Sequence, residues 1–495
     1  MSSTSAFKRK CSNASAPRMK SDPTKPAARQ TVDLLIVGAD WLVTMDESRR
    51  LIRQGAVAID KDRIVAVGKT ADLEARYNAG QTLQARDKIV LPALINTHLH
   101  HTQQLARGMA DECEIERWLV ERIYPYEAAM TKEEARISAL AGHLDMIKNG
   151  TSTYIDPGGY YPDETAQVTG ETGLRGIITR STLDVHTSTY GAIPKNLTSE
   201  DTKEALKEGE ETVKRWHNAF DGRLRAWFGL RSMRNCSDNL CRGVKELADQ
   251  YGVGVEAHVL GSHPNIWASI SRFGCTDVER LHRLGVLGPN WLMVHMGWVS
   301  PHEVHLLRQY DIKISQCPAA SMHGSSGRIY HGAFTEMVQL GVCVSIGSDS
   351  GPEGNFNDIV RNMYLASCTA KDQQLDAQLM PATTTLEMAF RNGARAALWE
   401  DEIGSLEAGK KADIVLFDTQ KPEWQPLHDP VSTLVYSATG ASADTLIVDG
   451  RIIMEGRRVL TMDEEAVLKE SQAVAESIAR RAGLDRLAAP RWPVF

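Results

Sequence analysis

The middle of this 495-residue chain, residues 92–401, alternates short apolar runs with amphipathic stretches. The apolar runs have the length of buried strands, as in VGVEAHVL, NWLMVHMGWV and VCVSIGSDS. The stretches between them carry helix signals, because capping boxes begin at Thr131 and Ser300 and Gly252 follows a helical pattern as a C-cap. Repeated strand–helix units of this kind predict an α/β fold, namely a (β/α)8 TIM-like barrel.

The two ends of the chain carry a different pattern. Residues 31–91 contain alternating runs such as VDLLIVGADWLVTM and GAVAIDKDRIVAVG, and residues 402–460 contain KKADIVLFD and ADTLIVDGRIIMEGRRV. These two sets of strands predict one small discontinuous β-sandwich domain formed by both chain ends. Residues 1–30 are rich in Ser, Pro, Lys and Arg and predict a disordered tail, since they lack the apolar stripe of a transit peptide. Residues 461–495 predict a C-terminal helix and tail.

Composition excludes several classes of partner. The net charge of −7 gives no reason to expect nucleic acid or an anionic membrane. No apolar run approaches the roughly 18 residues of a membrane span. The eight cysteines include no CxxC pair, so reduced thiols in a cytoplasmic protein are expected.

The stretch ALINTHLHH, residues 93–101, ends an apolar run with His98 and His100. Residues i and i+2 of a strand point to the same side, so these two imidazoles project together from the strand end. Alone, such a pair is more often a chance HxH than half of a divalent metal site.

Three further strands end in groups that bind metal: His258 ends VGVEAH, His295 ends WLMVH and Asp349 ends VSIGSD. A barrel brings the carboxyl ends of its strands together around one axis. Imidazoles and a carboxylate around one divalent ion, with zinc expected ahead of iron or manganese, leave a position for water and lower its pKa. Asp349 then serves as ligand and general base, and His295 hydrogen-bonds the attacking water or the developing oxyanion.

At this point the chain resembles the amidohydrolase superfamily, in particular its mononuclear-metal chlorohydrolase and aminohydrolase branch (triazine hydrolase and cytosine deaminase-like). The resemblance spans nearly all of residues 31–460 and rests on LPALINTHLHHTQQLARGMADE, IKNGTSTYID, VEAH, MVH, CPAAS, SIGSDS, RNGARAALW and IGSLEAGKKADIVLFD. It implies the metal ligands His98, His100, His258 and Asp349, and a contact of His295 with the catalytic water. It also implies a small-molecule substrate and a homodimer or larger homo-oligomer. No lysine ends AWFGLRS, where binuclear relatives carry a carboxylated lysine, so one ion is expected.

The chain departs from this pattern at two positions. Deaminases of the branch carry HxxE after the third ligand histidine, whereas this chain has His258-Val-Leu-Gly261, and glycine transfers no proton. Arg231 stands where a substrate-contacting histidine is usual. These changes favour cleavage of a non-peptide C–N bond of an amide, urea or carbamate. The alternatives are a hydrolytic deaminase or dechlorinase of an N-heterocycle and, in another class, a catalytically silent scaffold.

Polar and aromatic residues near the strand ends are candidates for substrate binding. Arg231 has a fork of donors for a carbonyl or an anion. The other candidates lie in loops, where a solvated histidine or a core aromatic is an equally ordinary interpretation. The predicted substrate-binding residues are Gln104, Trp118, Arg231, His263 and His323.

Overall fold

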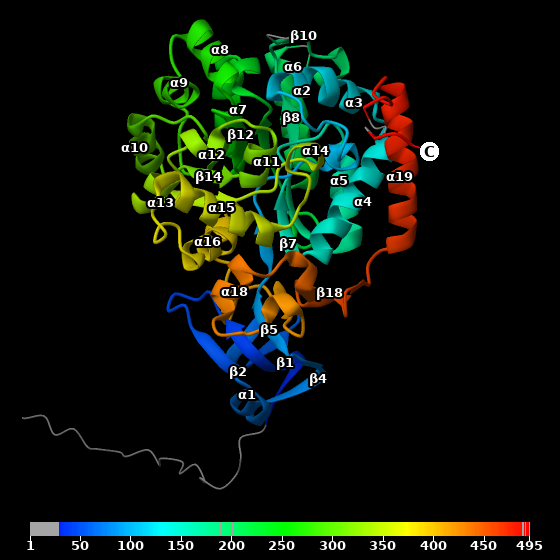
Figure 1. Cartoon of the computed structure of the whole chain (residues 1–495), viewed down its shortest axis with the longest axis vertical. Helices are drawn as coiled ribbons and strands as arrows, with labels where there is room; N and C mark the ends of the chain where they lie inside the picture. Colours follow the sequence, from blue (N-terminus) through cyan, green and yellow to red (C-terminus); the bar gives the residue numbers. More distant parts are fainter. Residues whose placement is uncertain (1–28, 189–190, 200, 488–489, 491, 495) are drawn as a thin grey trace, which may run out of the picture.

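The computed structural model describes residues 29–188, 191–199, 201–487, 490 and 492–494. The predicted tail at 1–30 therefore lies, except for its last two residues, outside the described residues. Figure 1 shows a barrel surrounded by helices above a smaller β-rich domain, to which both ends of the chain contribute. The predicted fold class is confirmed.

The barrel is one parallel sheet of eight strands within the described residues, in the order β15-β14-β13-β12-β11-β8-β7-β6. The strands are β6 (Leu94–Asn96), β7 (Thr151–Ile155), β8 (Arg175–Thr182), β11 (Leu224–Leu230), β12 (Val255–Val259), β13 (Trp291–His295), β14 (Lys313–Gln316) and β15 (Cys343–Ile346).

Helices cover the outside of the barrel and supply its connections. They are α4 (Lys132–Lys148), α5 (Pro162–Thr172), α6 (Thr202–Trp216), α7 (Asp238–Tyr251), α8 (His263–Phe273), α9 (Asp277–Leu284), α10 (Pro301–Gln309), α11 (Pro318–His323), α12 (Arg328–His331), α13 (Phe334–Gln339), α14 (Gly351–Gly354), α15 (Ile359–Gln374), α16 (Ala382–Ala389) and α17 (Arg391–Ala396). The capping boxes at Thr131 and Ser300 are both formed, and Gly252 ends α7 in the left-handed conformation.

A long insertion follows β6 and covers the carboxyl end of the barrel. It contains η1 (His101–Ala106), α2 (Ile115–Trp118), η2 (Leu119–Ile123) and α3 (Tyr124–Ala129). A smaller hairpin, β9 (Thr187–Ser188) with β10 (Gly191–Ala192), and η3 (Lys195–Leu197) follow β8, and η4 (Met233–Asn235) follows β11.

The β-rich domain consists of one hydrogen-bonded path, β19-β18-β17-β16-β5-β1-β2-β3, with β4 beside β1. Its strands are β1 (Gln30–Val43), β2 (Leu51–Asp60), β3 (Arg63–Lys69), β4 (Tyr77–Gln84), β5 (Lys88–Pro92), β16 (Ile414–Asp418), β17 (Ala443–Val448), β18 (Arg451–Glu455) and β19 (Arg458–Val459). Its short helices are α1 (Thr70–Arg76), η5 (Pro422–Trp424), α18 (Pro430–Tyr436) and η6 (Gly440–Ser442). The antiparallel pairing of β16 with β5 joins the two chain ends.

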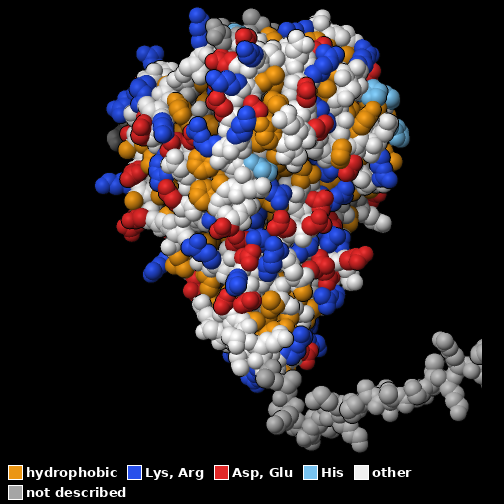
Figure 2. Space-filling model, turned by 180° about the vertical axis from the view of Figure 1, so that it is seen from behind, with side chains coloured by type: hydrophobic (Ala, Val, Ile, Leu, Met, Phe, Trp, Pro, Cys, Tyr) orange, Lys and Arg blue, Asp and Glu red, His pale blue; other side chains and the backbone are white. Residues whose placement is uncertain are grey.

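The last helix, α19 (Glu464–Arg481), packs beside α4 on the outside of the barrel (Figure 1). No helix in the described part of the chain is long and apolar enough to cross a membrane. On the face shown in Figure 2, Lys and Arg side chains are interspersed with Asp and Glu side chains. The seven cysteines among the described residues are all free.

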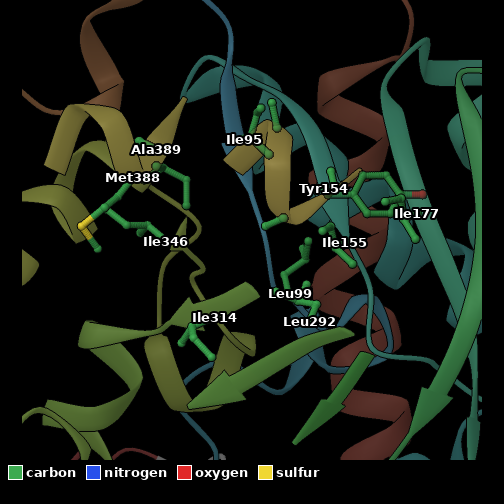
Figure 3. Close-up of a cluster of buried hydrophobic side chains, with 14 of the residues drawn as sticks. Ile95, Leu99, Tyr154, Ile155, Ile177, Leu292, Ile314, Ile346, Met388 and Ala389 are labelled. Atoms are coloured by element: carbon green, nitrogen blue, oxygen red, sulfur yellow. The ribbon is translucent and has the colours of Figure 1, made fainter. Parts of the chain in front are cut away.

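The barrel strands and the helices around them share one packed core. Ile95, Ile155 and Ile177 from the first strands and Ile314 and Ile346 from the last are fully or almost fully buried (Figure 3). Leu99, just beyond β6, belongs to the same cluster. Close packing of these side chains supports the strand ends, where the functional groups of such a barrel lie.

Backbone hydrogen bonds close the barrel between its first and last strands. The amide of Thr97 donates to the carbonyl of Ile346 over 3.1 Å. The carbonyl of His98 accepts from the amides of Ser348 and Asp349, over 3.1 and 2.9 Å. These bonds bring the ends of β6 and β15 together.

A buried ion pair joins the barrel to the β-rich domain. Arg175, at the start of β8, donates over 2.7 Å to Asp413 and over 2.7 Å to Asp449. The side chain of Arg175 is 1% exposed. Burial acts to lower its pKa, but the two carboxylates outweigh burial and raise it.

Replacing Arg175 with Met is expected to cost about 3–5 kcal/mol of stability, because it leaves the buried carboxylate of Asp413 without its guanidinium partner, while Asp449 keeps Lys411 and Arg223 nearby. Urea unfolding followed by circular dichroism measures the change. The control is Arg136→Met, which removes a solvent-exposed pair with Glu171 and is expected to cost at most about 1 kcal/mol. Equal losses in the two variants would show that the junction does not depend on this pair.

Candidate metal centre and active site

Four strand ends bring five polar side chains to one point at the carboxyl end of the barrel. His98 and His100 follow β6, His258 lies on β12, His295 ends β13 and Asp349 follows β15. All five groups predicted from the sequence therefore lie together in the structure.

The distances between these groups fit one metal ion. The Nε2 atoms of His258 and His100 are 3.3 Å apart. One oxygen of Asp349 lies 3.6 Å from Nε2 of His98 and 3.7 Å from Nε2 of His100. Ligands about 2.0–2.1 Å from a tetrahedral zinc ion are separated by about 3.3 Å, so the observed spacing is close to that of a ligand shell.

Unpartnered atoms also support a cation at this point. Nε2 of His98 and Oδ2 of Asp349 are buried and have no hydrogen-bond partner among the described residues. A buried polar atom without a partner is costly, and a bound cation removes that cost. A single divalent ion thus fits between His98, His100, His258 and Asp349. His295 lies 3.8 Å from Oδ2, the other carboxylate oxygen of Asp349.

Glu256 fixes the orientation of the His98 ring through the ring nitrogen Nδ1. Its carboxylate lies 2.8 Å from Nδ1 of His98, and both side chains are fully buried. A carboxylate at one ring nitrogen directs the other nitrogen to a metal. Burial acts to lower the pKa of His98, but Asp349 and Glu256 outweigh it and raise the pKa to about 9. Burial raises the pKa of Glu256 to about 7.

The other imidazoles are held neutral. Burial lowers the pKa of His100, His258 and His295, and neighbouring positive groups lower it further. A neutral imidazole has the lone pair that a metal needs. Burial acts to raise the pKa of Asp349, but its histidine neighbours outweigh burial and lower it, so Asp349 is an anion.

The backbone is strained where two of these side chains leave their strands. His295 has φ 81° and Asp349 has φ 66°, in the left-handed region that L-residues seldom adopt. Such conformations cost about 1–3 kcal/mol each and are kept where the surrounding structure fixes them. At His295 and Asp349 the surrounding structure therefore fixes the direction of the side chain at the cost of an unfavourable backbone conformation.

A cavity of about 710 Å³, including its mouth, opens above the five residues. Its wall is formed by the insertion after β6, the segment after β11 and the ends of β12, β13 and β15. The lining includes His100, Glu116, Trp118, Tyr124, Arg231, Arg234, His258, Gly261, Asn265, His295, Arg328, Asp349 and Glu353.

Three buried arginine–glutamate pairs surround this cavity. Arg231 donates to Glu127 over 3.1 Å. Arg234 donates to Glu116 over 2.5 Å. The third pair joins Arg328 and Glu353, with 3.0 Å between Nη2 and Oε1. Each arginine is at most 6% exposed. The cavity wall therefore contains buried guanidinium donors, each of which is paired with a glutamate carboxylate.

The predicted substrate-binding residues separate into two groups. Trp118 and Arg231 line the cavity. Gln104 does not: its amide donates to the carbonyl of His100 and accepts from Asn357, so it supports the loop of the ligand pair. His263 is exposed and accepts from Trp267, and His323 lies at the outside near Asp111 and Asn355. The chain turns away from the cavity at these three positions, so the structure does not support them as substrate contacts.

Several residues of the site were not predicted from the sequence. Glu256 was detectable, because it lies two residues before His258 on one strand and therefore points to the same side. Glu116 and Glu127 lie in the insertion after β6, where no periodic pattern assigns a direction. Arg328 begins α12 and Glu353 lies within α14, and only the folded chain brings them together.

Comparison with known proteins supports this geometry. The model described as "Amidohydrolase family" matches residues 89–453, and the model described as "Imidazolonepropionase-like composite domain, bacteria" matches residues 55–77. A 5′-deoxyadenosine deaminase of Methanosarcina acetivorans is 34% identical over 453 residues, which is 91% of this chain and 99% of that protein. A 5-methylthioadenosine/S-adenosylhomocysteine deaminase of Desulforudis audaxviator is 33% identical over 425 residues, 86% of this chain and 95% of that protein.

Solved structures agree in fold. An adenosine deaminase from Xanthomonas campestris with bound zinc superimposes with a TM-score of 0.85 at 27% identity, covering 91% of this chain and all of that chain. A triazine hydrolase from Arthrobacter aurescens superimposes with a TM-score of 0.80 at 21% identity, covering 89% of this chain and 99% of that chain. The second likeness, at this identity, concerns the fold alone.

Replacing Glu256 with Gln is expected to weaken zinc affinity about 10- to 100-fold, because the carboxylate that orients His98 is lost while all four ligands remain. Competition with a chromophoric chelator measures the affinity. The control is Glu164→Gln, a buried glutamate on α5 paired with Lys132, which is expected to leave zinc affinity unchanged. Equal affinities in the wild type and Glu256→Gln would contradict the supporting role of Glu256.

Proposed function

The chain belongs to the amidohydrolase family and is a hydrolase acting on C–N bonds, and we propose that it removes an exocyclic amino group from an N-heterocycle by metal-assisted hydrolysis. The observation that carries this proposal is the convergence of His98, His100, His258 and Asp349, with His295 beside them, at the base of one cavity. The relatives above, named as deaminases of adenosine derivatives, support the substrate class.

His98, His100, His258 and Asp349 would hold the ion, and zinc is proposed because a neighbouring structure was solved with it. A bound divalent ion lowers the pKa of a water molecule toward about 7. Asp349, an anion beside the attacking water, accepts the water proton and returns it to the leaving nitrogen. His295, neutral and 5% exposed, hydrogen-bonds the attacking oxygen and orients it toward the substrate carbon.

The sequence favoured an amide, urea or carbamate over a ring, because Gly261 replaces a glutamate. The relatives favour the deaminase of an N-heterocycle, one of the alternatives that the sequence also left open. Displacement of chloride from an N-heterocycle is the second candidate, because a halide leaves without the proton that Gly261 is unable to supply.

The third alternative, a silent scaffold, has little support in the site. A protein without catalytic activity does not need neutral imidazoles gathered at one cavity. It also does not need strained backbone at His295 and Asp349, or buried polar atoms that lack a hydrogen-bond partner among the described residues. We propose in addition that the enzyme is cytoplasmic and forms a homodimer or larger homo-oligomer.

The direct test is a panel assay on zinc-loaded protein with 5′-deoxyadenosine, 5′-methylthioadenosine, S-adenosylhomocysteine, guanine, atrazine and an arylurea. We expect ammonia release from at least one aminated ring and loss of this activity on chelation, restored by zinc. Turnover of the arylurea alone would contradict the proposal, and inactivity toward the whole panel with less than one zinc per chain would favour the scaffold.

Asp349→Asn removes both a ligand and the proton carrier, so kcat on the best substrate is expected to fall at least about 1,000-fold. Steady-state kinetics measure this loss. The matched control is Asp311→Asn, an exposed aspartate between α10 and β14 that is expected to keep wild-type kinetics. Asp349→Asn with more than a tenth of wild-type kcat would exclude Asp349 as the proton carrier.

A further inference from the structure

Gly261 leaves the end of β12 without a side chain, and a guanidinium occupies the adjoining space. Nε of Arg328 donates to the carbonyl of Gly261 over 2.6 Å. A Cβ at position 261 would lie 3.2 Å from the ring of His295, so the wall is already tight there. Arg328, from α12, thus holds the backbone of Gly261 and lines the same cavity as His295.

The side chain of Arg328 is held at three points, one at its base and two on its guanidinium. Gly297 approaches so closely that a Cβ there would lie 2.4 Å from Cα and Cβ of Arg328. Nη2 lies 3.0 Å from Oε1 of Glu353, and both side chains are 5% exposed. Nε is held by the carbonyl of Gly261. A donor fixed in this way loses little freedom when it binds a further acceptor.

The remaining nitrogen, Nη1, is free to act. It is buried, has no hydrogen-bond partner among the described residues and lies 3.7 Å from Oδ2 of Asp349. Asp349 is the proposed proton carrier, so Nη1 is directed to the space where the substrate carbon and its neighbouring atoms would lie. A fixed, buried donor at such a place stabilises developing negative charge.

We propose that Nη1 of Arg328 is the group that activates the ring, in place of the absent acid at position 261: it hydrogen-bonds the ring nitrogen next to the carbon that is attacked. This inference rests on the proposed function. It makes Arg328 a catalytic residue that contacts substrate, with Glu353 and Gly261 as its positioning partners.

The step balances without proton transfer from Arg328. The water oxygen forms a bond to the ring carbon, the π pair of the C=N bond moves to the ring nitrogen, and Nη1 donates a hydrogen bond to that nitrogen while keeping its proton. Asp349 carries one water proton to the exocyclic nitrogen. The exocyclic C–N bond then breaks with its pair going to ammonia, and the ring nitrogen pair restores the C=N bond of the hydroxylated product.

This arrangement has a consequence for substrate choice. A guanidinium stays protonated, so it stabilises charge and never delivers a full proton. Rings that already accept negative charge well, such as triazines and other electron-poor heterocycles, need only this help. Among aminated rings, the enzyme is therefore expected to favour the electron-poor ones.

The test compares Arg328→Met and Arg328→Lys with the wild type on the best substrate of the panel. In Arg328→Met, kcat is expected to fall about 100-fold with KM within about 3-fold, as for loss of one oxyanion-hole donor. Arg328→Lys keeps the positive charge but loses the forked guanidinium, so its kcat is expected to lie between those of Arg328→Met and the wild type. Zinc content is measured in parallel and is expected to stay at the wild-type value. The thermal unfolding midpoint is expected to fall in Arg328→Met, because the buried Glu353 loses its partner, so kcat is measured well below that midpoint.

Two further readouts separate catalysis from structure. Guanidinium chloride at millimolar concentration is expected to raise the rate of Arg328→Ala and not that of Asp349→Asn. Calorimetric affinity for the deaminated product is expected to fall about 10-fold in Arg328→Met, in line with a lost charged hydrogen bond. The control for loss of one positive charge is Arg395→Met, an exposed arginine paired with Asp311 on the outside of the barrel.

Wild-type kcat in Arg328→Met would overturn this assignment, while the panel activity of the wild type would still support the proposed function. Loss of activity that follows loss of zinc, with neither lysine nor guanidinium restoring it, would equally overturn it and give Arg328 a purely structural role.

Discussion

The site depends on the closure of the barrel between β6 and β15. The carbonyl of His98 accepts the amides of Ser348 and Asp349, so the first and last strands end at the same point. Without this closure His98 and Asp349, 251 positions apart in the chain, would not meet. The strained backbone at His295 and Asp349 then aims their side chains inward. Packed isoleucine, leucine and tyrosine side chains of the barrel strands support this geometry (Figure 3).

Charge around the cavity is arranged in pairs rather than as a field of one sign. Arg231, Arg234 and Arg328 each face a buried glutamate, so the cost of burying each cation is offset within the wall. Burial acts to raise the pKa of Glu353, and the adjacent Arg328 guanidinium acts to lower it. The wall therefore presents donors in fixed positions, and this preorganisation is what an enzyme needs to stabilise charge that develops during a reaction.

The sequence predicted the barrel, the composite β-rich domain and the five strand-end groups, because strand ends in a parallel barrel converge and periodicity shows where strands end. It placed Trp118 and Arg231 at the cavity but also Gln104, His263 and His323, which follow strands in sequence and then turn away. Arg328 and Glu353 escaped prediction, because their meeting depends on loop geometry and on the close approach of Gly297. Glu256 was also predictable, because it lies two residues before His258 on a strand, just as His98 lies two residues before His100.

The central claim is that residues far apart in the chain hold one catalytic ion at the end of the barrel. Anomalous diffraction at the zinc edge from crystals of the zinc-loaded protein tests it most directly. The account predicts one strong peak, within about 2.0–2.2 Å of His98, His100, His258 and Asp349. A peak elsewhere, two peaks in the cavity, or none at all in protein that contains zinc would contradict it.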